Sequence, residues 1–425
     1  MAEVLRLRRD ATWEGGVLLE GHIQMRLGAL PPGLETAMAL LAGDGADEDA
    51  LDEAAGEAEL MALQLLLRNL ETKGWLDRVL VEDGRAVASL TPVGHELVPV
   101  LVRPPEVVLS RFAYVRVDGG ELVVETPKAS LRVWIHDPAA LRRVLAPAAG
   151  DPLGRLLVRA GIAVAPGAED GFELAQWQFH DLLQHARSRV GRNLGDYGGS
   201  YRFEGRFPPL PAVKPQFEPS FALPKATLDD PLSRVLEQRR SVREHDDEHP
   251  ITAAQLGEFL FRAARLRDTF HDGKQELSTR PYPSGGAAYE LELYPLVRLC
   301  EGIEPALYHY DPAGHTLGLV AEPGPRTTLL LEYARFTAVM EQPPQVVILL
   351  AARFGRVTWK YESMAYALVL KHVGVLYQTM YLVATAMGLA PCALGGGNSD
   401  AFAAATGLDY YVEPAVGEFI LGSRG

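Results

Sequence analysis

Cysteine is nearly absent from this chain of 425 residues, which has only Cys300 and Cys392. The two lie far apart and outside any CxxC pair, so the sequence indicates neither a disulfide framework nor a structural zinc site. The segment EHDDEHP, residues 244–250, holds acids and histidines but is typical of a polar turn, and we expect no metal there. So few cysteines suit a reducing cytoplasm, where we expect the protein to act.

Long basic runs and long uninterrupted apolar runs are also missing. The formal net charge is −14, which repels a polyanion such as nucleic acid. The N-terminus has no apolar stretch behind its arginines, which argues against a signal peptide. The most apolar segment, residues 365–394, is broken by Lys371, His372 and Gln378 within the roughly 20 residues that a membrane helix needs. We therefore expect a buried helix, and neither nucleic acid nor membrane as a partner.

The remaining composition is that of a folded protein, with 48% apolar and 23% charged residues. A chain of this length usually forms two or three domains. Six prolines between Phe207 and Lys225 favour extended backbone and indicate a linker. The predicted division is 1–103, 104–206, a proline-rich linker 207–230, and 231–425.

The first two segments each contain helices beside a predicted strand pair. Residues 59–94 show leucines at helical spacing, a glycine stop at Gly74, and two strand patterns around Asp83-Gly84. Helix plus hairpin is the layout of a winged helix. A hairpin and short helices recur over residues 114–164, so we predict tandem winged-helix-like modules.

The C-terminal segment mixes helices with strands. Residues 229–266 predict two helices, the second capped by Thr252. Strand patterns follow at 291–299, 306–311 and 344–354, then a long helix from about Glu362 to Met387 and a last strand at 416–425. This order predicts an α+β fold with a mainly antiparallel sheet and a long core helix.

Three segments have compositions suited to binding a ligand. RRSVR, residues 239–243, places guanidinium groups and a serine at a helix end, where they match phosphate oxygens. RPYPSGGAAYELELY, residues 280–294, lets a flat ligand lie against backbone that lacks Cβ atoms. GLAPCALGGGNSD, residues 388–400, has more glycine than a helix end requires and leads to a helix capped by Ser399 or Asp400. A solvated helix end and plain turns are the alternatives.

Lys360 and Tyr361 stand together where the long apolar helix is predicted to begin. Lysine is a poor base at its ordinary pKa near 10.4, but apolar surroundings and a helix N-terminus both disfavour its charged form. The pair could therefore take up a proton. The alternative is a lysine that reaches solvent from a helix end while the tyrosine packs.

Taken in order, RRSVR, RPYPSGGAAYELELY, KYE and GLAPCALGGG resemble the nitroreductase-like flavoprotein superfamily, and within it the SagB-type or McbC-like azoline dehydrogenases of ribosomal peptide biosynthesis. The resemblance covers residues 232–424. It implies FMN as the cofactor, a homodimer, and Lys360 and Tyr361 as catalytic residues. The FMN-binding positions that it implies are Arg239, Arg240, Ser241, Arg243, Pro283, Ser284, Gly285, Gly286, Gly395, Gly396 and Arg424.

The activity implied by the resemblance is oxidation of peptide-borne thiazolines or oxazolines to thiazoles or oxazoles, with dioxygen reoxidising the flavin. The implied partners are an azoline-containing precursor peptide and a cyclodehydratase. The N-terminal modules resemble leader-binding regions, and a peptide could add to a winged-helix hairpin as an extra strand. Two alternatives stay open: an NAD(P)H-dependent nitroreductase, and a non-catalytic docking subunit of a biosynthetic complex.

Overall fold

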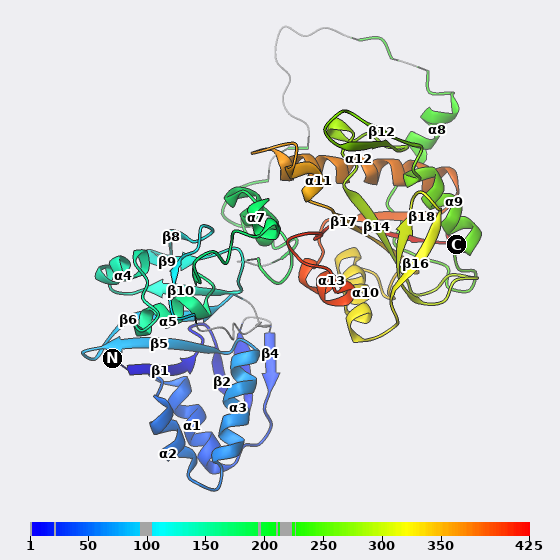
Figure 1. Ribbon diagram of the computed structural model, residues 1–425. Coiled ribbons are helices and arrows are strands. Elements are labelled where there is room, and N and C mark those ends of the chain that lie inside the picture. Colours follow the sequence, from blue (N-terminus) through cyan, green and yellow to red (C-terminus); the bar gives the residue numbers. More distant parts are fainter. Residues whose placement is uncertain are drawn as a thin grey trace. The chain divides into compact units, whose positions relative to one another are not determined.

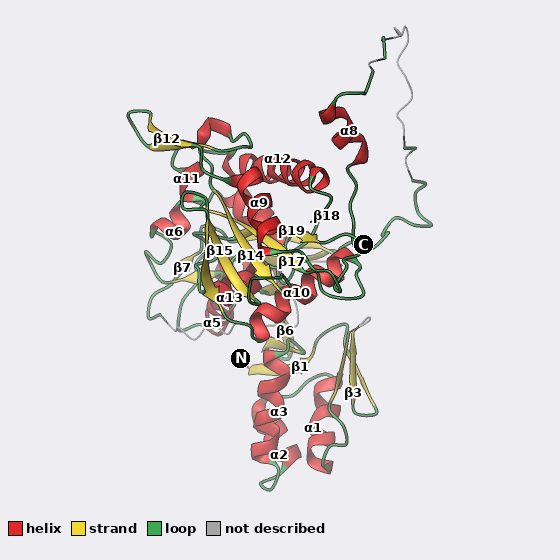
Figure 2. Ribbon diagram, turned by 90° about the vertical axis from the view of Figure 1, so that its right-hand side faces the viewer, coloured by secondary structure: helices red, strands yellow, loops and turns green. Residues whose placement is uncertain are grey.

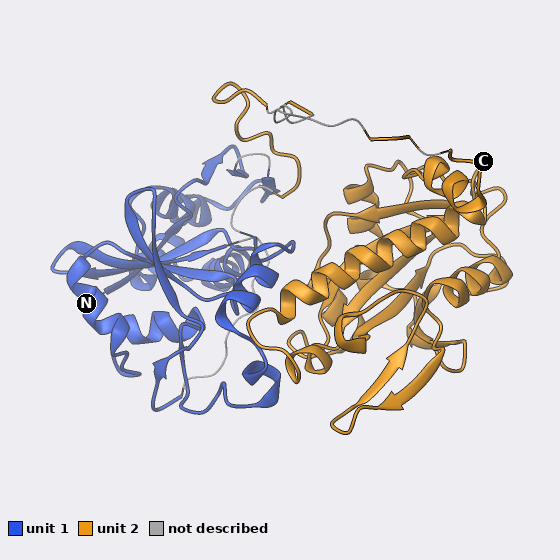
Figure 3. Cartoon of the chain, turned by 90° about the horizontal axis from the view of Figure 1, so that it is seen from above, with its two compact units in different colours: residues 1–194 blue, residues 195–425 orange. Residues whose placement is uncertain are grey.

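The computed structural model describes residues 2–20, 23–93, 104–193, 197–209, 211–212, 223–225 and 227–425. The chain divides into two units, residues 1–194 and 195–425, which Figure 3 shows in separate colours. Each unit has its own hydrophobic core. The finer division into four segments remains a prediction.

The N-terminal unit combines a three-stranded sheet, a six-stranded sheet and several helices (Figure 1). Its strands are β1 (Ala2–Leu7), β2 (Thr12–Glu14), β3 (Val17–Glu20), β4 (Ile23–Arg26), β5 (Leu76–Glu82), β6 (Arg85–Pro92), β7 (Val108–Leu109), β8 (Tyr114–Asp118), β9 (Glu121–Glu125), β10 (Leu131–Ile135) and β11 (Ala163–Val164). Its helices are α1 (Pro32–Ala42), α2 (Glu48–Ala55), α3 (Leu60–Thr72), the 3-10 turn η1 (Pro138–Ala140), α4 (Leu141–Leu145), α5 (Pro152–Arg159), α6 (Phe172–Ala175) and α7 (Phe179–Arg187).

The predicted winged-helix layout is present at the start of this unit. Helix α3 stops before Gly74, and β5 and β6 pair around Asp83 and Gly84, which both have the positive φ of a tight hairpin turn. Helices α1, α2 and α3 bury their leucines in one core with residues of β1. The second predicted hairpin, β8 with β9, is present too.

The two predicted N-terminal modules share one sheet. Its strand order is β1-β5-β6-β10-β9-β8, so β6 pairs with β5 on one side and with β10 on the other. Since neighbouring residues of a strand point to opposite faces, the sheet has an apolar face in the core and a polar face. The modules are therefore parts of a single structural unit.

The C-terminal unit is built on a second six-stranded sheet. The strands of this unit are β12 (Asp268–His271), β13 (Glu276–Thr279), β14 (Leu291–Val297), β15 (Ala306–Asp311), β16 (Thr316–Ala321), β17 (Val346–Ala352), β18 (Ala390–Leu394) and β19 (Ala415–Gly422). Its helices are α8 (Pro231–Gln238), α9 (Ala253–Ala264), the 3-10 turn η2 (Gly285–Ala287), α10 (Pro325–Ala338), α11 (Gly355–Thr358), α12 (Ala365–Ala386) and α13 (Ser399–Thr406).

Helices cover both faces of this sheet, whose antiparallel strands run in the order β16-β15-β14-β17-β19-β18 (Figures 1 and 2). On one face Ile420 of β19 packs in a core with residues of α10 and α13. On the other, the Phe419 ring stacks on Phe259 of α9 and meets Tyr381 of α12 edge-on. Every residue of β14 and β17 is buried. The α+β fold with a long core helix is confirmed.

Several predicted boundaries were wrong. Helix α12 begins at Ala365 and not near Glu362, because Ser363 has a φ of +50°, which a helix does not admit. Asn398 caps α13 through a bond from the Ala401 N–H, in place of the predicted Ser399 or Asp400. The segment after α12 is not all loop, since it contains β18. The predicted capping of α9 by Thr252 is confirmed as a capping box.

Within the described part of the chain, α12 alone is long and apolar enough to cross a membrane. This is weak evidence, because the core helix of a soluble protein passes the same test. Helix α12 packs on the sheet of the C-terminal unit.

Candidate functional site

The arginine-serine segment, residues 239–243, leaves the end of α8 and runs beside β18. The Val242 N–H donates to the Pro391 carbonyl over 2.8 Å, and the Ser241 hydroxyl bonds the Tyr381 hydroxyl over 2.7 Å. Tyr381 also accepts the Ala393 N–H over 2.8 Å. One buried tyrosine of α12 thus holds both the segment and the strand beside it.

The guanidinium groups of this segment remain available to a ligand. Arg239 is half-buried over the Tyr381 ring, with its guanidinium carbon 5.2 Å from the ring centroid, while Arg240 and Arg243 are exposed. Exposed Arg424 follows Ser423, whose hydroxyl donates to the Asp246 carbonyl just beyond the segment. Among the described residues none of these four arginines has an ion-pair partner, which suits them to binding an anion such as phosphate.

The proline-serine-glycine turn, residues 283–286, is anchored to α12 by a histidine. The Gly285 N–H donates to His372 Nε2 over 2.7 Å, and Ser284 Oγ accepts the Tyr289 N–H over 3.0 Å. Because Nε2 accepts, Nδ1 carries the ring proton and donates it to Glu290 Oε1 over 2.7 Å. His372 is 5% exposed and Glu290 is fully buried, so an internal histidine–glutamate pair fixes the turn, while Glu290 Oε2 has no hydrogen-bond partner among the described residues.

Lys360 and Tyr361 lie against this same turn. Lys360 Nζ donates to the Gly286 carbonyl over 3.3 Å. A Cβ added at Gly286, whose φ is +63°, would come 2.2 Å from the Tyr361 hydroxyl and 2.9 Å from Lys360 Nζ. The structure therefore brings together two segments that are far apart in sequence, at a glycine that leaves them the room.

The surroundings of Lys360 differ from those predicted. Its N–H and that of Tyr361 both donate to the Val357 carbonyl, so the pair closes the short helix α11 and does not open α12. Lys360 is also exposed in the single chain. The apolar, helix-N-terminal environment that we expected for this lysine is not formed by one chain alone.

The third glycine run follows β18. A Cβ on Gly396 would come 2.7 Å from the Tyr197 ring, whereas one on Gly395 would meet open space. Gly397, which sequence reasoning did not select, is the most crowded, since a Cβ there would collide with the buried Glu418 side chain. The Gly397 N–H donates to the Tyr197 hydroxyl over 3.4 Å.

The arginine-serine segment and the proline-serine-glycine turn attach to different parts of α12. Their anchors, Tyr381 and His372, are nine residues apart, which is about 13 Å along a helix. In Figure 1 helix α11, which Lys360 and Tyr361 close, lies at one end of α12, while α8 and α9 lie toward the other. One chain therefore carries both predicted halves of the site at separate places.

Sequence reasoning missed the anchoring residues His372, Glu290 and Tyr381. The available signal was a histidine inside an otherwise apolar helical pattern, which we interpreted only as a break in a membrane span. Residues 244–250 are engaged locally: Asp247 pairs with Arg298 at 2.7 Å and Asp246 with His249 at 2.9 Å. In the described ranges no three His, Cys, Asp or Glu side chains gather as a metal site would require.

Comparison with known proteins identifies the C-terminal unit. Residues 236–422 match the nitroreductase family. The chain is 32% identical over 164 residues to the Methanocaldococcus jannaschii protein described as "Putative nitroreductase MJ1384", covering 39% of this chain and 78% of that protein. The chain belongs to the nitroreductase family. This is a family of oxidoreductases, and the resemblance predicted from the four motifs is confirmed.

A further family match lies upstream of residue 236, and a second relative shares part of the chain. Residues 107–152 and 146–194 match the family described as cyanobactin oxidase ThcOx. The Escherichia coli microcin B17-processing protein McbC is 32% identical over 115 residues, 26% of this nitroreductase-family chain. The chain spans only 42% of McbC's length.

Some solved structures resemble parts of the chain at lower identity. One is the E. coli microcin synthetase McbBCD complex with truncated pro-MccB17 bound, at 23% identity and a TM-score of 0.39, covering 53% of this chain and 86% of that one. Another is a nitroreductase from Desulfovibrio desulfuricans in complex with FMN, at 17% identity and a TM-score of 0.31, covering 45% and 86%.

Proposed function

We propose that the chain is an FMN-dependent dehydrogenase that oxidises thiazolines or oxazolines, carried on a ribosomally made precursor peptide, to thiazoles or oxazoles. The observation that carries the proposal is the position of Lys360 and Tyr361 on the glycine of the proline-serine-glycine turn. Aromatising such a ring needs a proton acceptor beside the place where the cofactor receives a hydride.

The residues present fit FMN. The FMN phosphate would be held by Arg239, Arg240, Ser241, Arg243 and Arg424. The four arginines have no ion-pair partner among the described residues, and the Ser241 hydroxyl is on the same segment as three of them. Pro283, Ser284, Gly285, Gly286, Gly395 and Gly396 would lie along its ring, with Lys360 and Tyr361 packed against Gly286. Bound FMN would supply the acceptor for the hydride that leaves the azoline.

The proton is the part of the reaction assigned to this chain's side chains. The azoline ring loses a hydride from one carbon and a proton from its neighbour, and Lys360 Nζ or Tyr361 Oη would take that proton. Lys360 must be neutral to do so, and a peptide bound over this exposed amine would favour the neutral form by excluding water. The electrons would pass finally to dioxygen.

A homodimer would complete the site. None of the eight residues of α8, all of them described, is buried, and Leu232 and Leu236 on it are 59% and 44% exposed. Such an amphipathic helix with an uncovered apolar side is suited to packing on a second copy. In the dehydrogenases that this chain resembles, the partner subunit often supplies the proline-serine-glycine turn, which agrees with the separation of the two half-sites along α12.

The proposed partners are an azoline-containing precursor peptide and a cyclodehydratase, with the reaction in the cytoplasm. The support is that the chain resembles a protein named for processing microcin B17. The N-terminal unit would recognise the peptide. If a truncated chain that begins after residue 206 binds the peptide as well as the full chain does, this role is removed.

The test is turnover of a thiazoline-bearing peptide by FMN-loaded protein, followed by azole absorbance and mass loss. Lys360→Ala and Tyr361→Phe are each expected to slow the reaction by about 100-fold, as the loss of a general base does, without releasing FMN. Lys274→Ala, at an exposed lysine of the β12–β13 hairpin, is the control and should leave the rate unchanged. Unchanged turnover in both site variants would sink the proposed roles.

The second candidate is an NAD(P)H-dependent nitroreductase. Two observations favour it: the Methanocaldococcus jannaschii relative is described as a "Putative nitroreductase", and Lys360 is exposed in the single chain. NAD(P)H-driven reduction of a nitroaromatic compound that survives Lys360→Ala, with no azole formed, would establish it. A protein that cannot be loaded with FMN would instead favour a docking subunit.

A further inference from the structure

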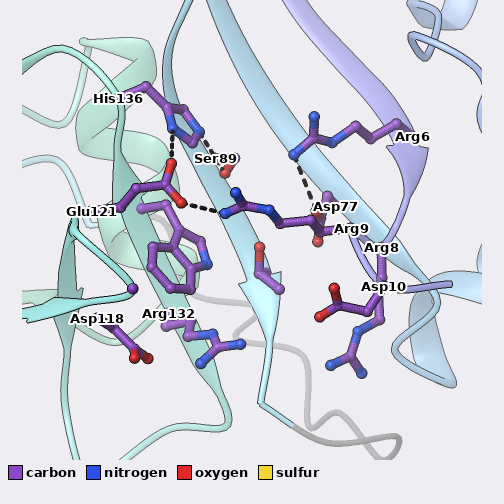
Figure 4. A pocket seen from close by; sticks show the side chains of 13 residues that line it. Arg6, Arg8, Arg9, Asp10, Asp77, Ser89, Asp118, Glu121, Arg132 and His136 are labelled. Carbon is purple, nitrogen blue, oxygen red and sulfur yellow. Dashed lines mark hydrogen bonds and ion pairs between the residues drawn. The ribbon is translucent and has the colours of Figure 1, made fainter. Parts of the chain in front are cut away.

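The polar face of the N-terminal sheet forms the floor of a cavity of about 320 Å³ (Figure 4). Arg6 of β1 stands opposite Asp77 of β5, and Thr91 of β6 stands opposite Arg132 of β10. Trp134 of β10, His136 directly after β10 and Ser89 of β6 continue the same floor. The residues between them in sequence point into the apolar core, so strand alternation places these polar side chains on one face.

The walls of the cavity are largely self-satisfied. Residues 8–10, which follow β1, form one wall, and the β8–β9 turn forms the other. Arg9 pairs with Glu121 across the cavity, and Arg8 pairs with Glu20 at 3.0 Å. His136 shares a 2.9 Å hydrogen bond with Ser89.

Asp77 on the floor is an exception. It is 1% exposed, and among the described residues its Oδ1 has no hydrogen-bond partner, while Oδ2 lies 3.5 Å from an Arg6 nitrogen. Burial raises the pKa of this carboxyl group, although Thr91 and the charges of Arg6 and Arg8 oppose the rise. A buried acceptor left in this state is costly, and an N–H donor from a ligand would relieve it.

Arg132 is the second exception. Within the described chain its buried Nε has no partner and no carboxylate pairs with its guanidinium, which lies 4.9 Å from the centroid of the Trp134 ring. Burial lowers its pKa, and the nearby Arg8 adds to this effect, while the charges of Glu125 and Asp118 oppose it. Figure 4 shows the Arg132 side chain directed along the cavity floor. A planar guanidinium in this position needs an acceptor, and a carboxylate fits it in bidentate fashion.

We propose that this cavity binds an acidic amino-acid residue, glutamate or aspartate, with its carboxylate on Arg132, its N–H on Asp77 Oδ1 and its carbon stem against Trp134. Asp77 and Arg132 stand two strands apart, about 10 Å between backbones, which a long arginine and a glutamate residue can span together. The volume is at the small end of ligand cavities.

The charges at the cavity's edge limit what else could bind. Asp10, Asp118 and Glu121 line it, and although Arg9 pairs with Glu121 and Arg116 with Asp118, these carboxylates leave little net positive charge for a second or third negative group. A polyphosphate or nucleic acid is therefore disfavoured, and a single carboxylate is not. The inference goes beyond the proposed function, since it concerns the N-terminal unit and its test needs neither flavin nor turnover.

The test is isothermal titration of the full chain with three probes: a blocked glycine-glutamate-glycine tripeptide, its glutamine twin, and free glutamate. The glutamate tripeptide should bind at least tenfold more tightly than the glutamine twin. Binding of free glutamate as well would identify a free amino acid as a source, and binding of the tripeptide alone would identify a peptide. Equal binding of the two tripeptides, or binding of neither, overturns the proposal.

A variant pair assigns the binding to the cavity. Arg132→Gln should weaken glutamate-tripeptide binding at least tenfold, whereas Arg85→Gln, at an exposed arginine of β6 outside the cavity, should not. If circular dichroism shows that Arg132→Gln is unfolded, Arg132→Lys replaces it, because it keeps the charge and loses the planar fork. Unchanged affinity in a folded Arg132 variant also overturns the proposal.

Discussion

Gly286 has a conformation and a position that exclude a side chain. Its φ is +63°, and the space where a Cβ would stand is filled by the Tyr361 hydroxyl and Lys360 Nζ. Gly286→Ala should therefore lower the free energy of unfolding by about 1–3 kcal/mol and displace the pair, with at least a tenfold loss of turnover. Thermal unfolding and azoline oxidation measure the two effects.

The control is Gly324→Ala, in the same unit. Gly324 is extended, with a φ of −176°, and a Cβ there meets nothing within 4 Å. Because Gly324 is the N-cap of α10, we expect a loss of about 0.5–1 kcal/mol, the cost of alanine at that position, with normal turnover. If both variants behave alike, the crowding at Gly286 has no functional weight.

His245 makes the C-terminal unit sensitive to acid. Its Nδ1 accepts the Gln345 N–H over 3.2 Å, and burial lowers its pKa to about 4. The unfolded chain binds a proton near pH 6.5, so the folded state loses stability as pH falls from 6.5 toward 4, and the loss is complete below 4. Between pH 7 and pH 5 we expect a loss of about 2 kcal/mol from this group.

Urea unfolding at both pH values measures this loss. His245→Gln should be less stable at pH 7, because it disturbs a buried contact, but should lose less on acidification than the wild type. His271→Gln, at an exposed histidine of β12, should keep the wild-type pH dependence. An unchanged pH dependence in His245→Gln would contradict the assignment.

At the scale of elements, α8 has an exposed apolar side that is suited to packing on a second chain. Leu236→Glu places a charge on its uncovered apolar side and should convert a dimer, of twice the chain mass of 46.3 kDa, to monomer, with loss of bound FMN. Light scattering on a sizing column gives the mass. Glu237→Gln, exposed on the same helix, should remain dimeric, and a monomeric wild type would remove the dimer from the proposal.

Elements with local signals were predictable, and those that depend on distant partners were not. The Thr252 capping box and the Asp83-Gly84 turn depend only on residues that are close together in sequence. β18, with the sequence APCAL, is short and contains a proline, and it is a strand because it pairs with β19. Helix α10 was missed because exposed Leu329 and Phe336 blur its apolar periodicity.

The candidate site shows the same division. Its glycines and arginines were selected from composition and resemblance, because both signals are local to each segment. The hydrogen bond from Gly285 to His372 joins residues 87 positions apart, and no pattern in either segment predicts it. The sequence could also not show that Ser363 delays the start of α12, which leaves Lys360 at the end of α11.

For the whole molecule, two units with separate cores predict two unfolding transitions in calorimetry. FMN should raise the midpoint temperature of the C-terminal unit's transition only. At a hundredfold excess over its dissociation constant, it should raise the free energy of unfolding of that unit by about 2.7 kcal/mol. The double variant Arg239→Ala, Arg243→Ala should lose this response while keeping both transitions. A single transition that shifts as a whole with FMN would show that the units unfold together.

The pairing of β6 with β10 joins the two N-terminal modules in one sheet, and it determines how this protein could be recombined with others. A piece ending at residue 103 would leave β6 without β10 and expose an edge along Val87 and Leu90, which invites pairing with other chains. Chimeras that exchange only one module would therefore tend to aggregate. Residues 1–194 would have to be transplanted as one block. Any binding specificity of this part of the chain would therefore be transferred as a whole and not module by module.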